Sequence, residues 1–498
     1  MTVNLIPFQI HLSPALPTVV GNVDYHIFRQ QLDRINQLLH QCDVENQFVL
    51  LSTEQWLKQG ANHVRPINGK QQLIFQQHSR KALRCNIARI LTDESFRDFS
   101  ARLADSPVLQ KFCLLDNLPV IKVPGKSTLQ RYNNWLPAPA MRKIINPLLE
   151  QAGIDADLAE PLDLDAWFAD TTCLKANIHF PVDWVLLRDG TRTLMKAVIL
   201  IREQGLKHRM DDPEQFMREM NQLSIKMTMT RRKADSKRTR KKVLRQMKKM
   251  VRRVEKHAKR HHELLSGEWQ KTEWTEKQAE QVLSRIDRVL ELLPKARKQA
   301  HERIIGERTV KNADKMLSLY ETDARVIVRG KADAEIEFGN TLYLAENRQG
   351  VIVDYQLWRE SAPADSKMVE ESLKRITEIT GNDALPQVRS FAADRGFDSA
   401  KTRNSLSDAG IYNGICPRSP ASLKQRLQED RFVDCQLRRS QTEARIGIFK
   451  NKFLSRPLRA KGFERRELAV AWGVLAHNLW VIARMPIRED AATEPKAA

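Results

Sequence analysis

Three acidic residues of this 498-residue chain stand where carboxylates can support phosphodiester chemistry: Asp170, Asp394 and Glu443. Asp170 lies in the segment 167–174, which has the pattern of a strand, and Asp394 directly follows the apolar run 388–393, which predicts a buried strand. Divalent ions held by carboxylates can stabilise the attacking and the leaving oxygen of a displacement at phosphorus, and Mg²⁺ prefers oxygen ligands. The three residues therefore predict a two-metal site that cleaves phosphodiesters.

Glu443 belongs to a segment with helical periodicity, and two cations accompany it. Arg439 precedes it by four residues and Lys450 follows it by seven, so all three side chains are expected on one helix face. An Arg–Glu pair at this spacing is common on helix surfaces, where it contributes only ~0.3–0.5 kcal/mol. Because Asp170 and Asp394 have matching contexts, we interpret Glu443 as a metal ligand, with Arg439 and Lys450 beside a phosphate backbone.

Other acidic residues remain alternatives at each position. Asp163 or Asp165 could replace Asp170, Asp398 could replace Asp394, and Glu464 or Glu467 could replace Glu443. Their contexts fit less well, because Asp398 is expected to open a helix and because Glu464 and Glu467 lack an Arg and a Lys at matching helical turns.

The elements that must position these acids alternate between strands and helices. After the strand at 167–174, the pattern predicts two antiparallel strands, a helix, a strand, a helix, a strand and two helices, at 341–346, 351–358, 369–379, 388–393, 398–409, 411–416, 438–453 and 466–483. This order resembles the RNase H-like fold. We therefore expect an α/β RNase H-like catalytic core with a mixed sheet, interrupted after its first strand by a basic, all-helical insertion.

Positive charge is concentrated in that insertion. The formal net charge is +21, and residues 231–260 contain 16 Lys or Arg and two acids. Apolar residues recur there every three or four positions, which predicts an amphipathic helix. Like charges at such spacing repel unless a polyanion neutralises them, so we expect nucleic-acid contact rather than a merely solvated helix. The cations expected to contact DNA are Arg238, Lys241, Lys242, Arg245, Lys248, Lys249 and Arg252.

A second helix is expected to follow from about 275 to 293, with Pro294 ending or kinking it. Trp269 or Trp274 could stack on a base, although packing is the favoured use of either. His257 and His261 lie four residues apart on the basic helix and could share a metal, but solvated histidines are the favoured interpretation there.

The N-terminal part reads as short helices with turn-like breaks, which resemble a helix-turn-helix between about 80 and 136. A DNA-recognition helix near 127–136 would present Lys126, Gln130 and Arg131 outward. An ordinary helical bundle fits this pattern equally well.

Membrane and disulfide classes are disfavoured. No stretch of about 18 uncharged apolar residues occurs, and the N-terminus lacks the pattern of a signal peptide. The six cysteines form no CxxC pair, which favours a reducing cytosol and a cytoplasmic protein.

Four stretches carry a resemblance to a known family: 169–183, 324–346, 392–399 and 438–451. In these residues the chain resembles bacterial insertion-sequence transposases of the DDE class, and the ISNCY group in particular. The signature Tyr-x2-Arg-x3-Glu-x6-Lys of such enzymes is matched by Arg439, Glu443 and Lys450. It departs at its first position, where Gln436 replaces the tyrosine.

The resemblance implies that Asp170, Asp394 and Glu443 bind two Mg²⁺ or Mn²⁺ ions. Such an enzyme hydrolyses DNA at the ends of its element and then joins the freed 3′-hydroxyl to target DNA. The N-terminal region would bind the terminal inverted repeats, and a homodimer or higher multimer would act on paired ends. The rivals are a nuclease without strand transfer, a non-catalytic DNA-binding copy and a binder of anionic membranes, the last disfavoured because the basic helix lacks a Trp- and Leu-rich face.

The expected organisation has five parts. They are a mainly helical DNA-binding region, the first part of the core, the basic helical insertion, the second part of the core and a disordered tail, at 1–158, 159–205, 206–318, 319–484 and 485–498.

Overall fold

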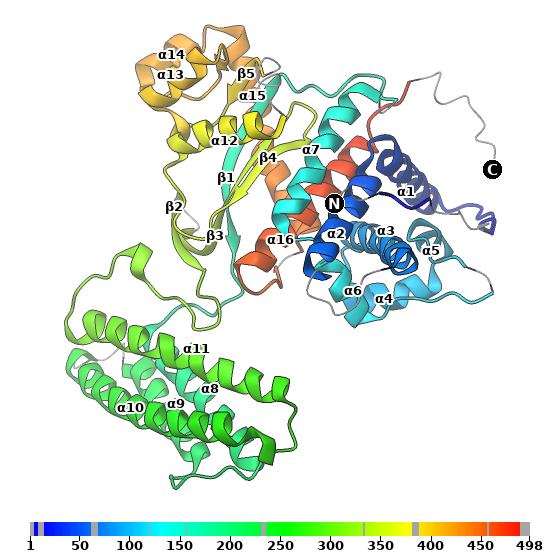
Figure 1. Ribbon diagram of the computed structural model, residues 1–498. Coiled ribbons are helices and arrows are strands. Elements are labelled where there is room, and N and C mark those ends of the chain that lie inside the picture. The colour runs from blue at the N-terminus through cyan, green and yellow to red at the C-terminus, as the bar shows by residue number, and fades with distance from the viewer. Residues whose placement is uncertain are drawn as a thin grey trace. The chain divides into compact units, whose positions relative to one another are not determined.

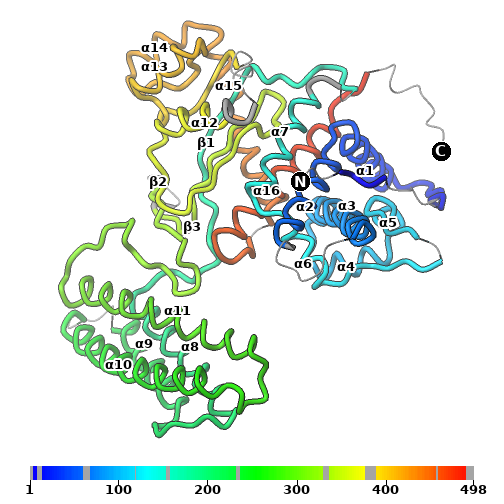
Figure 2. Tube along the Cα trace, in the orientation of Figure 1, coloured from blue at the N-terminus to red at the C-terminus, as the bar shows by residue number. Residues whose placement is uncertain are grey.

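The structure, a computed structural model, describes residues 4–7, 14–60, 68–117, 119–155, 157–230, 236–331, 334–380, 388–455 and 458–488. The chain forms two compact units, traced in Figures 1 and 2. Unit 1 comprises Met1–Leu174, Thr341–Trp358 and Ala362–Ala498, and unit 2 comprises Lys175–Asn340 and Arg359–Ser361. Of the tail expected to be disordered, 489–498 lies outside the described residues, whereas Ile487 pairs with Leu158.

Unit 1 begins with a series of helices, in agreement with the mainly helical N-terminal region that the sequence predicts. They are α1 (Val23–Gln41), α2 (Val44–Gly60), α3 (Gly69–Leu91), α4 (Phe96–Asp105), α5 (Pro107–Phe112), α6 (Lys126–Asn133) and α7 (Ala138–Asp155). Polar side chains start several of them: Asn22 accepts a hydrogen bond from the Tyr25 amide, and Asn68 forms a capping box with Gln71. These caps satisfy amide groups that would otherwise lack a partner at the helix N-terminus.

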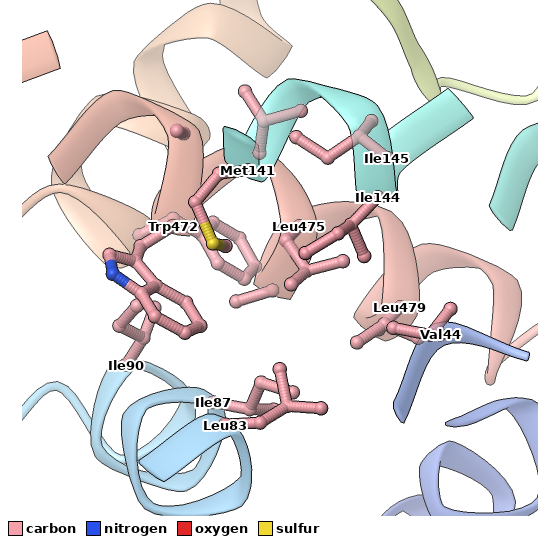
Figure 3. Close-up of a cluster of buried hydrophobic side chains, with 14 of the residues drawn as sticks. Val44, Leu83, Ile87, Ile90, Met141, Ile144, Ile145, Trp472, Leu475 and Leu479 are labelled. Atoms are coloured by element: carbon pink, nitrogen blue, oxygen red, sulfur yellow. The ribbon is translucent and has the colours of Figure 1, made fainter. Parts of the chain in front are cut away.

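The last helix, α16 (Phe463–Ile482), completes the core of these N-terminal helices. Figure 3 shows Trp472, Leu475 and Leu479 of α16 packed among side chains of α2, α3 and α7. The indole nitrogen of Trp472 donates a hydrogen bond to the carbonyl of Asn133, 2.9 Å away, so the buried ring keeps a polar partner. The two ends of the chain therefore share one hydrophobic core.

The sheet contains six strands in the order β2-β3-β1-β5-β6, with β4 also paired to β3. Their bounds are β1 (Ala166–Lys175), β2 (Arg325–Lys331), β3 (Ala334–Glu346), β4 (Ile352–Leu357), β5 (Ser390–Ala392) and β6 (Tyr412–Asn413). The pairs β1–β5 and β5–β6 are parallel, whereas β2–β3 and β3–β4 are antiparallel. A mixed sheet of this kind with many helices is consistent with an RNase H-like core in the C-terminal part of the chain.

Helices cover both faces of this sheet in unit 1. On one face, Trp167 and Ala169 of β1 pack with Met368 and Leu406, which belong to α12 (Asp365–Thr380) and α13 (Ala400–Asp408). On the other face, Phe168 packs with Cys435 of α15 (Asp430–Ile448), which continues into the π-helical turn Phe449–Phe453. Because successive side chains of a strand point to opposite faces, β1 contributes to both layers. The short helix α14 (Pro420–Arg426) precedes α15.

Unit 2 is built on four helices with a core of their own: α8 (Asp183–Glu203), α9 (Pro213–Thr230), α10 (Ser236–Glu268) and α11 (Glu276–Ala300). The unit begins at Lys175, earlier than the boundary at 206 that the sequence suggests, because the apolar face of α8 packs into this core. Gly190 allows α8 to approach α11 closely, since a Cβ atom there would lie 2.5 Å from Cδ1 of Leu293.

Pro294 was expected to end or to kink the second helix, and the expectation of an end is wrong. The helix α11 continues through Pro294 to Ala300. Leu293 and Ala296 on either side are fully buried in the core of unit 2, whereas Pro294 is exposed. Burial on both sides of the proline therefore outweighs the one backbone hydrogen bond that its ring removes.

Candidate catalytic site

Asp170 and Asp394 lie at the same level of two neighbouring parallel strands. The register pairs Phe168 of β1 with Ala392 of β5. Continued by two residues, this register places Asp170 opposite Asp394, and neighbouring strands lie only ~4.8 Å apart. The carboxyl ends of parallel strands meet at one edge of a sheet, so the two acids come together there although 224 positions separate them in the sequence.

The guanidinium group of Arg439 lies between these two carboxylates. Its Nη2 atom is 3.6 Å from Oδ2 of Asp170 and 4.0 Å from Oδ2 of Asp394. Both distances exceed that of a hydrogen bond, and the buried Nε atom of Arg439 has no hydrogen-bond partner among the described residues. The two acids therefore share one cation, which lies beyond hydrogen-bond distance of both.

One face of β1 meets a row of cations from α15 and the turn that follows it. The guanidinium of Arg438 stacks on the ring of Phe168 at 4.8 Å from the centroid, and Arg439 reaches Asp170. Lys450 donates a hydrogen bond of 3.0 Å to the hydroxyl of Thr172. Phe168, Asp170 and Thr172 alternate along the strand and so share one face.

Arg438 anchors this helix in the sheet. Its side chain, buried with that of Glu346, forms an ion pair of 3.0 Å with this residue and donates to the carbonyls of Asn347 and Arg348. The hydroxyl of Thr442 donates to the same carboxylate at 2.9 Å. Burial lowers the pKa of Arg438, while the neighbouring Glu346 opposes that shift. These contacts of the Arg438 guanidinium fix the orientation of α15 against the sheet.

Asp394 begins a tight turn at the exit of β5. Its Oδ1 atom accepts a hydrogen bond of 2.8 Å from the amide of Gly396, two residues later. A Cβ atom on Gly396 would lie 2.9 Å from this oxygen and 2.9 Å from Oδ2 of Asp365. Asp365, the first residue of α12, thus brings a further carboxylate close to Asp394. Asp365 was not expected from the sequence, where the available signal was its position at the start of the helix that precedes the strand of Asp394.

Glu443 lies one helical turn after Arg439 on α15, and its side chain is exposed. At this spacing the two side chains share a face of the helix. Within the described ranges, no group of three or more His, Cys, Asp or Glu side chains is arranged to hold a metal ion. Glu443 is therefore near the pair of aspartates in the fold without completing a ligand cluster.

The donor set nevertheless suits a hard divalent cation. Asp170 and Asp394 offer carboxylate oxygens in register, and a positively charged nitrogen of Arg439 already lies between them. Mg²⁺ and Mn²⁺ take such oxygen ligands together with water. The residues present therefore fit the ions that the sequence implies, provided that Arg439 gives up its position.

The alternative acids lie elsewhere. Asp163 and Asp165 stand before the start of β1, where they pair with Arg348 and Arg389. Asp398 binds Arg403 and accepts a hydrogen bond from the backbone amide of Arg418, and it is buried. Glu464 and Glu467 belong to the first turns of α16 rather than to α15. The acids that contact Arg439 are instead Asp170 and Asp394.

A second feature, in unit 2, is an outward row of cations on α10. Its exposed members recur every three or four residues: Arg238, Lys242, Arg245, Lys249, Arg252, Lys256 and Lys259. The row covers ~32 Å at 1.5 Å per residue. Among the described residues, no carboxylate forms an ion pair with any of these seven side chains. We call them the outward row.

Lys241 and Lys248, which the sequence analysis groups with this row, lie on another side of α10. Lys241 pairs with Glu307 at 2.8 Å, and Lys248 contacts Nδ1 of His301 at 3.0 Å. Burial and the nearby Arg252 lower the pKa of Lys248. The two lysines therefore face the segment that follows α11, a difference that one residue of helical rotation produces.

His261, Trp269 and Trp274 of unit 2 are packed side chains. His261 is fully buried, which corrects the expectation of a solvated side chain, and its Nδ1 atom lies 2.8 Å from the carbonyl of His257. Trp269 and Trp274 pack against the core of unit 2. Burial lowers the pKa of His261 because the apolar surroundings disfavour the charged ring.

In unit 1, α6 presents the three polar side chains that the sequence analysis expects to contact DNA. Lys126, Gln130 and Arg131 are exposed, whereas Leu129 and Tyr132 are buried against α3 and α4. The connection from the end of α5 to α6 is longer than the three- or four-residue turn of a helix-turn-helix. The exposed face agrees with the sequence pattern, while the connection does not.

Among the helices in the described residues, none has the length and apolarity that a membrane crossing requires.

Comparison with known proteins bears on the C-terminal part of the chain. Residues 343–479 match the family model described as the transposase DDE domain. Neither the curated proteins nor the solved structures gave a match. The matched range contains Asp394, Arg439, Glu443 and Lys450, and it begins after Asp170. The resemblance to the bacterial insertion-sequence group stays a prediction, but residues 343–479 of this chain carry a transposase DDE domain.

Proposed function

We propose that this protein is a transposase that cleaves DNA at the ends of an insertion sequence and joins those ends to target DNA. The observation that carries the proposal is the pairing of Asp170 and Asp394 at one sheet edge, with the guanidinium of Arg439 between them. The match of residues 343–479 to the transposase DDE domain supports it.

In this proposal Asp170, Asp394 and Glu443 hold two Mg²⁺ or Mn²⁺ ions. Such ions supply charge stabilisation for the attacking and the leaving oxygen at phosphorus. Arg439 keeps the two aspartates together until their charge is neutralised otherwise, and its guanidinium can then turn to a DNA phosphate. Lys450 presents its ammonium group on the same face of β1 through Thr172, where it can bind the backbone of the same DNA strand.

Two further surfaces offer cations to DNA. The outward row of α10 would neutralise successive phosphates without reading sequence, since phosphate contacts position a protein but do not specify bases. The exposed face of α6, with Lys126, Gln130 and Arg131, would contact the terminal repeats. A homodimer or higher multimer would bring two ends together.

The test is metal-dependent nicking of a supercoiled plasmid by the full chain in Mg²⁺ or Mn²⁺. Asp170→Asn and Asp394→Asn are expected to abolish nicking, whereas Asp163→Asn, an equal change in the segment before β1, is expected to retain it. If nicking were lost in Asp163→Asn but kept in Asp170→Asn and Asp394→Asn, the assignment of the catalytic acids to Asp170 and Asp394 would be wrong. Binding of DNA without any metal-dependent nicking would show a non-catalytic DNA-binding protein.

Strand transfer needs a separate assay. A short duplex with a recessed 3′-hydroxyl, taken from DNA next to the gene, is incubated with a supercoiled target plasmid and the wild-type protein. Covalent joining of duplex to plasmid is the expected product. Nicking without any joined product would identify a nuclease that lacks strand transfer.

A further inference from the structure

Gln436 occupies the signature position at which related enzymes carry a tyrosine, and the structure gives its side chain a task. Its Nε2 atom donates a hydrogen bond of 2.6 Å to the carbonyl of Gly414 and a longer one of 3.4 Å to the carbonyl of Ala393. Gly414 follows β6, and Ala393 follows β5. One amide group of α15 thus spans the ends of two neighbouring strands.

The ends of β5 and β6 pack closely against each other and against α15. The amide of Gly414 donates to the carbonyl of Phe391 at 2.7 Å, and the amide of Cys416 donates to that of Ala393 at 3.1 Å. A Cβ atom on Gly414 would lie 3.1 Å from Cβ of Ala392 and 3.2 Å from Cβ of Cys435. The ends of β5 and β6 therefore contact α15 directly, and a shift of one must move the others.

Asp394 is the next residue after Ala393, so this contact fixes where its side chain begins. Gln436, Arg439 and Glu443 follow one another at three and four residues and so line one face of α15. The first of them holds the exit of β5, and the second lies between Asp394 and Asp170. The separation of the two carboxylates therefore depends on the contact between α15 and the end of β5.

We propose that Gln436 is a positioning residue, whose amide clamps the ends of β5 and β6 to α15 and so sets the carboxylate of Asp394 against that of Asp170. The proposal rests on the function proposed above. An amide suits this task because its nitrogen carries two protons and can serve two carbonyls at once, whereas a tyrosine hydroxyl carries one proton. In this chain the signature position thus acts on the protein backbone and not on DNA.

The test separates positioning from mere stabilisation. Gln436→Met keeps the length of the side chain and removes both donors. Gln441→Met is the matched control, because Gln441 is an exposed glutamine on the same helix that makes no hydrogen bond among the described residues. Each full-length variant is measured for Mn²⁺ binding by electron paramagnetic resonance, plasmid nicking, DNA affinity in EDTA and thermal unfolding.

For Gln436→Met we expect the Mn²⁺ midpoint to rise about tenfold and the maximal nicking rate to fall about ten- to hundredfold, since misplacement of a catalytic group by ~1 Å costs up to ~100-fold. DNA affinity in EDTA should stay within about twofold, and the thermal midpoint should fall by only a few degrees, because one neutral hydrogen bond contributes little to global stability. Gln441→Met should match the wild type in every measurement.

An unchanged Mn²⁺ midpoint and nicking rate would overturn the proposal, and so would a loss of DNA affinity with Mn²⁺ binding intact. If Gln436→Met does not fold, Gln436→Asn replaces it, because its shorter amide cannot reach both carbonyls. Asp394→Asn separates the two hypotheses. If it binds Mn²⁺ and nicks DNA as the wild type does, the proposed function fails; if it loses both while Gln436→Met is normal, only the role of Gln436 fails.

Discussion

The outward row of α10 makes a prediction that a matched pair of variants can decide. Lys242 and Lys249 belong to this row and are exposed, whereas Lys241 and Lys248 face the segment that follows α11. Both pairs consist of lysines seven residues apart on the same helix. Changing either pair to glutamine therefore removes the same charge from the same element and differs only in the side of the helix.

The expected magnitude follows from counterion release. Each phosphate that a cation neutralises contributes about −0.9 to the slope of log K against log salt, so Lys242→Gln/Lys249→Gln should reduce the slope by about 1.8. Between about 50 and 200 mM salt, the wild type should then lose about twelvefold more affinity than this variant. Adding Arg245→Gln and Arg252→Gln should bring the total reduction to about 3.6.

The assay is fluorescence anisotropy of a labelled duplex of arbitrary sequence, titrated with the full chain in EDTA over a range of KCl concentrations. Lys241→Gln/Lys248→Gln should change the slope by less than about 0.5, since neither side chain points to the proposed phosphates. Thermal unfolding should show no loss for Lys242→Gln/Lys249→Gln, because like charges on that row repel. Equal slopes for both double variants would refute the assignment of the outward row to DNA.

Three further predictions concern the support of the site. Arg438→Met should lower the free energy of unfolding in urea by about 3–5 kcal/mol, because it leaves the buried carboxylate of Glu346 without a neutralising cation, and adding Glu346→Gln should restore part of this loss. Gly350→Ala should cost about 1–3 kcal/mol in the same assay, since Gly350 has φ of 90° and a Cβ atom there would lie 1.4 Å from Nη1 of Arg445; Arg445→Ala should relieve the clash but not the backbone strain. Burial lowers the pKa of His477 from 6.5 to about 4, so the unfolded state takes up the proton first as the pH falls. About 3 kcal/mol of stability should therefore be lost between pH 6.5 and 4. This part of the pH dependence of the free energy of unfolding should vanish in His477→Gln, and its persistence in that variant would contradict the assignment to His477.

The sequence was informative about Asp170 and Asp394 because each stands in or after a strand-like run, and parallel strands bring such positions to one edge. Periodicity also placed the apolar stripe of α10 in a core and its cations outside. It could not separate Lys241 from Lys242, because which side of a helix meets a neighbour depends on a partner helix more than thirty residues away.

Side-chain partners were beyond the reach of pattern alone. Arg439 was expected beside a phosphate, but the register of β1 and β5 places two carboxylates next to it. The helix start at Asp365 did not tie this residue to Asp394, because their approach depends on the absence of a Cβ atom at Gly396. His261 has many basic neighbours in the sequence, yet its position on the inner face of α10 buries it completely.

The way in which unit 2 joins the sheet has an evolutionary consequence. The chain enters unit 2 at Lys175, the last residue of β1, and leaves it within β3, the neighbour of β1 in the sheet. Lys175 pairs with Glu337, and the amide of Ala176 donates to the carbonyl of Phe338, so the end of β1 lies beside the first half of β3. A tight turn could bridge that gap in place of the whole helical unit. Ancestral genes could therefore have gained, lost or exchanged the segment between these positions, which takes β2 with it and leaves in place the strand that carries Asp170.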